Sequence, residues 1–301
     1  MMFNKLFSVG LNLGEPEEEI KKFIGDYCEY LSSIYFSLPL GDRFYSRTEL
    51  KKEYEAKHSL EKLKRLIIYM RQLGIRSELT VNSYGLSIDD LKIIKPFVCE
   101  NEIDIDEIVC LDEYASFLRT AFPNVELKYS FNNKDPQNIP NIFDTVVVGK
   151  KYLRSNEDRE RIYKTGKKVI FLVNNGCNFN CTNRCGGTAY CEKFLNAELL
   201  ENDVNYIYAQ QSFFPNELRK LIYEVPNGID FGIKISNRPL GLRYTRIVID
   251  MYMSDDMEKV WEYLRNDIDN YYIFCTMASL MKYRNQFNLD EIRRYKDELH
   301  L

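Results

Sequence analysis

Short apolar runs alternate with longer amphipathic segments along almost the whole chain. The runs have the length and composition of buried strands. In the segments between them apolar residues recur three and four positions apart, as at Leu60, Leu63, Ile67 and Met70, which is the spacing of an amphipathic helix. The alternation predicts repeated βα units and a parallel sheet. The expected strands are 3–11, 33–38, 75–81, 107–111, 126–131, 145–148, 168–173 and 230–236.

The segments between these runs carry helix start and stop signals. Pro16 stands just before the acidic residues 17–19, Ser87 is suited to cap a helix, and Gly74 ends one. The weakest helical pattern lies between the fifth and sixth strands. The expected helices are 15–31, 43–73, 88–99, 113–121, 157–164 and 216–223, with further helices through 244–301.

The number and order of these elements indicate the fold class. Eight strands with intervening helices in about 240 residues are typical of an α/β protein with a (β/α)8 TIM-like barrel, and a doubly wound open sheet is the alternative. No linker or low-complexity tract divides the chain. We therefore expect one barrel over 1–243, which carries a cysteine loop at 174–194, and a C-terminal helical extension over 244–301 packed on the barrel.

Composition and charge narrow the range of partners. The 301 residues include 41 basic and 45 acidic side chains, so the net charge of −4 gives no global attraction for nucleic acid, which is not indicated as a partner. No apolar run approaches the roughly 18 residues of a membrane span, so no membrane partner is expected. The beginning of the chain lacks the apolar stretch of a signal peptide, which predicts a cytoplasmic, reducing location.

Four of the eight cysteines fall in one polar loop directly after the seventh strand. A reducing location disfavours disulfides between them. Four thiolates suit an iron–sulfur cluster (4Fe-4S) or a structural tetrahedral zinc, and free redox thiols are the third alternative. The radical SAM triplet is the less favoured comparison, because its second gap is shorter and it follows the first strand. The predicted metal ligands are Cys177, Cys181, Cys185 and Cys191, spaced C-x3-C-x3-C-x5-C.

Polar residues follow the strands of the expected barrel. In this fold the active site lies where the strands lead into the following loops. Asn also ends strands for purely conformational reasons, so each such residue alone has a simpler explanation. Asp112 and Glu113, after the fourth strand, are candidate catalytic carboxylates. The candidate substrate-binding residues are Asn12, Arg43, Asn82, Asn132, Asn174 and Asn175.

Three stretches resemble the collagenase-like peptidase family, peptidase family U32, over residues 140 to 255. They are FDTVVVGKKYL, KKVIFLVNNGCNFNC and IDFGIKISNRP, and the last is similar to the family signature through Lys234, Ile235, Ser236 and Arg238. The resemblance implies a TIM barrel. Members include proteins described as peptidases or collagenases, RNA-modification factors, and iron–sulfur proteins of oxygen-independent ubiquinone hydroxylation that use four cysteines.

Three functions follow from these patterns. The first is a 4Fe-4S enzyme for an oxygen-independent hydroxylation or related modification, as the resemblance implies, with Lys234 and Arg238 in the catalytic site. The second is a peptidase that uses Asp112 or Glu113, since His58 and His300 are the only histidines. The third is a zinc-stapled scaffold, in which Lys234 is a paired core lysine. The expected partners are a small-molecule or peptide substrate and an electron donor or other protein.

Overall fold

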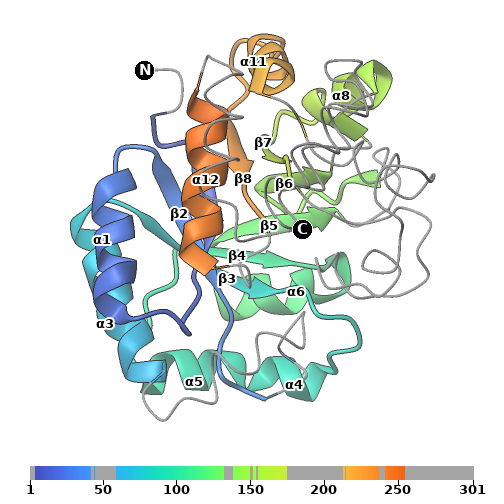
Figure 1. Cartoon of the computed structure of the whole chain (residues 1–301). Coiled ribbons are helices and arrows are strands. Elements are labelled where there is room, and N and C mark those ends of the chain that lie inside the picture. Colours follow the sequence, from blue (N-terminus) through green and yellow to red (C-terminus); the bar gives the residue numbers. More distant parts are fainter. Residues whose placement is uncertain are drawn as a thin grey trace, which may run out of the picture.

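The computed structural model describes residues 4–41, 44, 59–131, 138–149, 152–153, 155–174, 213, 215–236 and 241–254. Its centre is a closed barrel of eight strands, each hydrogen-bonded in parallel to the next in sequence, with β8 returning to β1 (Figure 1). The predicted barrel is confirmed and the open sheet is wrong. The strands are β1 Phe7–Gly10, β2 Leu31–Phe36, β3 Arg76–Val81, β4 Glu107–Cys110, β5 Glu126–Phe131, β6 Thr145–Gly149, β7 Lys168–Leu172 and β8 Phe231–Lys234.

Helices surround the barrel on its outside (Figure 1). The first ends at Tyr27 rather than at residue 31, because Leu31 already begins β2. The segment 88–99 is two helices rather than one, and Ser87 caps the first by accepting from the backbone N–H of Asp90. The helices are α1 Glu17–Tyr27, α3 Ser59–Gln72, α4 Ile88–Lys92, α5 Ile94–Glu100, α6 Asp112–Ala121, α8 Asn156–Tyr163, α11 Pro215–Tyr223 and α12 Gly241–Met253.

The main hydrophobic core lies between the strands and this ring of helices. Phe7, Val9 and Ile34 on the outer faces of the strands are at most 1% exposed and belong to one apolar cluster with buried helix residues such as Ile20 and Leu63. Burial on this scale supplies the main driving force for folding. The outer layer therefore carries the stability of the barrel, which leaves its inner face free to hold polar side chains.

Helix α12 follows β8 and closes the ring of helices around the barrel. It packs against α11 and α1, and the Tyr27 hydroxyl donates to Asp250 Oδ1 at 2.8 Å while Arg246 pairs with Asp26 at 2.9 Å. The domain boundary predicted at residue 243 falls inside this helix. Most of 244–301 lies outside the described residues, so the C-terminal extension stays a prediction. Among the helices that the structure describes, none is both long and apolar enough to cross a bilayer.

Candidate functional site

The inner face of the barrel carries both charged and apolar side chains. Lys128 of β5 and Lys234 of β8 both donate to Glu78 of β3. These strands are not neighbours, so the contacts cross the interior. A separate apolar cluster, Val109, Val147 and Ile170 with Leu172 against it, lies on β4, β6 and β7.

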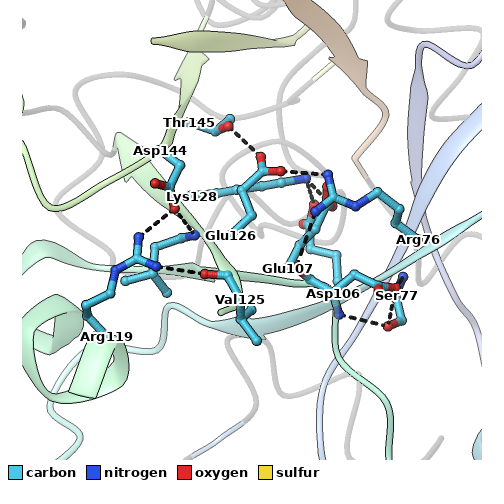
Figure 2. A network of polar contacts seen from close by, with 12 residues as sticks. Arg76, Ser77, Asp106, Glu107, Arg119, Val125, Glu126, Lys128, Asp144 and Thr145 are labelled. Atoms are coloured by element: carbon cyan, nitrogen blue, oxygen red, sulfur yellow. Dashed lines mark hydrogen bonds and ion pairs between the residues drawn. The ribbon is translucent and has the colours of Figure 1, made fainter. Parts of the chain in front are cut away.

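Five charged side chains form a continuous chain of alternating sign through the interior. It begins at the amino-terminal end of the barrel, where Arg76 is 2.6 Å from Glu107, and Glu107 also binds Lys128. Lys128 is 2.7 Å from Glu78, and Glu78 binds Lys234 with its other oxygen. Figure 2 shows the first part of this chain, with Arg76 held in addition by Glu126. The carboxylates and Lys128 are 1% exposed, whereas the two terminal cations reach solvent.

The two buried carboxylates have opposite electrostatic environments. Burial would raise the pKa of Glu78, but Lys128 and Lys234 together lower it to about 2, so its carboxylate is ionised at neutral pH. Glu107 has a raised pKa, because burial and the nearby charge of Glu78 outweigh the attraction of Lys128 and Arg76. Glu78 is therefore the fixed negative charge at the centre of the barrel.

The two buried lysines differ in the same way. Lys128 contacts two carboxylates, which overcome the effect of burial and raise its pKa. Lys234 contacts one carboxylate, Glu78, and burial lowers its pKa, with the positive Lys128 acting in the same direction. Its ammonium group lies 4.1 Å from the centre of the Tyr35 ring, a cation–π contact. The Tyr35 hydroxyl donates to the Ile235 carbonyl at 2.7 Å, which fixes the ring beneath the end of β8.

Lys234 is the last residue of β8 and faces the carboxyl end of the barrel, where active sites of this fold lie. Inner-face residues near this end, such as Thr80, Asn82, Gly149 and Leu172, are partly exposed, so solvent reaches this level of the interior. Asn82 donates weakly to Ser130 at 3.4 Å. In the described part of the chain, Thr80 Oγ1 and Asn82 Oδ1 are buried polar atoms without a hydrogen-bond partner. The end of the barrel thus combines a buried amine with unsatisfied polar groups.

The point at which the cysteine loop leaves the barrel is fixed to the same end. Asn174 Oδ1 accepts from the backbone N–H of Ser236 at 2.7 Å, and the Ser236 hydroxyl donates to the Asn174 carbonyl at 3.0 Å. The backbone N–H of Phe213 donates to the Val173 carbonyl at 3.0 Å. The chain between 174 and 213 therefore both leaves from and returns to the carboxyl end of β7, next to β8.

The predicted site residues divide into three groups. Lys234, Asn82 and Asn174 lie at the carboxyl end of the barrel, as described above. Asn12 and Asp112 also follow the carboxyl ends of strands, β1 and β4, and accept from the backbone N–H groups of Gly14 and Glu113, each at 2.9 Å, contacts that shape a turn and a helix start. The other predicted site residues lie outside the described residues: Arg43, Asn132, Asn175, Arg238, Cys177, Cys181, Cys185 and Cys191.

Sequence reasoning missed the charges at the centre of the barrel. Glu78, Glu107 and Lys128 stand inside strand segments that are otherwise largely apolar, and a charge in such a position was the signal that could have found them. Of the cysteines outside the loop, Cys110 is buried and Cys99 is exposed on α5. Among the described residues, no group of His, Cys, Asp and Glu is suited to hold a metal ion.

The closed parallel barrel with helices between its strands places this chain in the class of (β/α)8 barrel proteins. No protein-family model and no curated protein sequence matches the chain.

Solved structures of several enzymes are similar to it. A β-N-acetylhexosaminidase from Bacteroides fragilis is 12% identical, with a TM-score of 0.51 over 87% of this chain and 69% of that one. A β-1,4-mannanase is 11% identical, with a TM-score of 0.46 over 94% and 99% of the two chains. A U32 peptidase is 13% identical, with a TM-score of 0.42 over 77% and 93%. At these identities the likeness shows the fold alone, so the family resemblance of the motifs stays a prediction.

Proposed function

We propose that this protein is an enzyme that modifies a small-molecule or peptide substrate at the carboxyl end of the barrel, with the help of a 4Fe-4S cluster. The ligands of the cluster are Cys177, Cys181, Cys185 and Cys191. The reaction class implied by the motif resemblance is an oxygen-independent hydroxylation or a related modification, with electrons supplied by a partner protein.

One observation carries this proposal: the segment with the cysteines starts and ends beside Lys234. Asn174 and Ser236 bind each other, and Phe213 returns to Val173, so both ends of the segment are tied to the carboxyl ends of β7 and β8. Cys177 follows Asn174 by three positions in the sequence. A metal held by these thiolates would therefore belong to the end of the barrel at which Lys234 meets solvent.

The donor set fits either an iron–sulfur cluster or zinc, because both are held by four thiolates. When bound, a cluster would supply one-electron chemistry at this end of the barrel. Lys234 provides a cation or amine for an oxygen-bearing group of the substrate, and Asn82 and Thr80 provide hydrogen-bonding groups that have no protein partner among the described residues. Glu78 accepts a hydrogen bond from the Lys234 ammonium group and holds that side chain in place.

The peptidase alternative finds little support in the described residues. Asp112 and Glu113 lie at the start of α6, where Asp112 accepts from the backbone of its neighbour. The zinc-stapled scaffold differs from the proposal in the identity of the metal, so metal analysis separates the two.

The test is purification under strict exclusion of oxygen, followed by visible absorption and by iron, sulfide and zinc analysis. We expect a brown protein with about four irons per chain. The colour and iron should be lost in Cys181→Ser, whereas Cys99→Ser, at an exposed cysteine on α5, should keep both. A colourless protein that retains one zinc per chain would overturn the cluster and favour the scaffold. Equal iron content in both variants would overturn the assignment of the ligands.

A further inference from the structure

The interior of the barrel holds two lysines that share one carboxylate but differ in the number of carboxylates that each contacts. Lys128 donates to both Glu78 and Glu107, whereas Lys234 donates to Glu78 alone. An ammonium group has three N–H donors. Among the described residues Lys234 therefore uses one donor on a carboxylate and places its charge against the Tyr35 ring, which leaves two N–H groups without an acceptor.

We propose that Lys234 is a catalytic amine that holds an aldehyde or ketone substrate covalently, as an iminium ion, at the carboxyl end of the barrel. The inference rests on the proposed function only in placing the substrate at this end, and it does not require the metal.

The position of Lys234 meets the two demands of such an amine. It must be reachable, and the Lys234 side chain is 11% exposed at the solvent end of the charge chain, while Lys128 is 1% exposed. It must also lose its proton more readily than an ordinary lysine, and burial together with the neighbouring ammonium of Lys128 lowers the pKa of Lys234. A pair of lysines whose pKa values are pushed in opposite directions is a usual sign that the two have different roles.

The residue beside Lys234 on β1 leaves a polar group available for a bound carbonyl compound. Ser8 of β1 is the register partner of Lys234. It is 1% exposed, and in the described part of the chain its hydroxyl has no hydrogen-bond partner. Buried hydroxyls without a partner are unfavourable unless a ligand or water binds them. Leu172, the partner of Lys234 on β7, forms the apolar side.

The chemistry balances without an oxidant or reductant. The neutral amine attacks the carbonyl carbon, so that a C–N bond forms and the C–O π bond breaks, with the electron pair moving to oxygen. The resulting carbinolamine loses its oxygen as water, and the oxygen takes up one proton from the amine and one from solvent. The product iminium carries a single positive charge in place of the ammonium. Glu78, ionised because its pKa is about 2, and the Tyr35 ring stabilise that cation where they stabilised the ammonium.

Reductive trapping tests this inference with acetaldehyde as the probe. The full chain is treated with acetaldehyde and cyanoborohydride near neutral pH, and each modified lysine is identified by peptide mapping at short times. A lowered lysine pKa raises the fraction of neutral amine at neutral pH. We therefore expect Lys234 to be alkylated faster than Lys92, a surface lysine whose side chain is 61% exposed.

The control is Lys234→Arg, which keeps a cation next to Glu78 but removes the amine. It should lose the fast adduct and leave the slow surface adducts unchanged. Trapping should persist in Cys181→Ser, so a failure of the metal proposal leaves this inference standing. Modification of Lys234 no faster than Lys92, or an equal fast adduct in Lys234→Arg, would overturn the inference while leaving the metal analysis unaffected.

Discussion

Glu78→Gln removes the negative charge that two buried lysines share while keeping nearly the same side-chain shape. In the native barrel, Glu78 is 1% exposed and binds Lys128 and Lys234 through separate oxygens. The variant leaves Lys234 without a carboxylate and Lys128 with Glu107 alone. Removing one partner of a buried ion pair is costly, because the remaining charge stays buried without compensation.

The pKa of Glu78 sets the size of the effect. It falls from 4.5 to about 2 on folding, and at 1.36 kcal/mol per pH unit this corresponds to about 3 kcal/mol of stability. Because the pKa is lowered in the folded state, this contribution is fully present above about pH 4.5 and is lost as the pH falls through 2. Glu107 acts in the opposite direction, since its raised pKa means that protonation favours the folded state.

The assay is urea unfolding followed by circular dichroism at several pH values. At pH 7 we expect Glu78→Gln to lower the free energy of unfolding by about 3 kcal/mol, and the difference from the native chain to shrink as the pH approaches 3. Glu61→Gln, at an exposed carboxylate 3.7 Å from Lys64, is the matched control and should change little. A loss at pH 7 no greater than that of Glu61→Gln would refute the reasoning, as would a difference that does not depend on pH.

Two further predictions concern the interior of the barrel. Lys128→Met removes the cation that two buried carboxylates share and should cost about 3–5 kcal/mol. Glu107→Gln should recover part of that loss in the double variant. A double-mutant cycle by urea unfolding measures the coupling, and strict additivity would contradict the shared contact. Gly232→Ala places a methyl group 2.8 Å from Ile170 Cδ1 and should cost about 1–3 kcal/mol. The cost should fall in the Ile170→Val background, which lacks that carbon; an equal cost in both backgrounds would show that the backbone oxygen of Leu6, 3.3 Å away, is the true obstacle.

The local pattern of the chain was sufficient to predict the barrel. Each β-strand predicted from an apolar run exists, and Glu126–Phe131 begins and ends as expected. Local signals failed where neighbouring elements compete for the same residues: α1 ends early because Leu31 begins β2, and 88–99 is divided between α4 and α5. At the site, Asn12 and Asp112 accept from backbone N–H groups of Gly14 and Glu113, and their predicted roles stay predictions.

The sequence by itself determined the order of strands and helices and the place of Lys234 in the eighth strand, because these depend on periodicity along one segment. Only the tertiary structure decided which charges meet. Glu78, Glu107, Lys128 and Lys234 come from four strands, two of them more than 100 positions apart in the chain, and closure of the barrel brings them together. Their pKa values follow from burial and from charges across the interior, and neither can be read from the residues next to them in sequence.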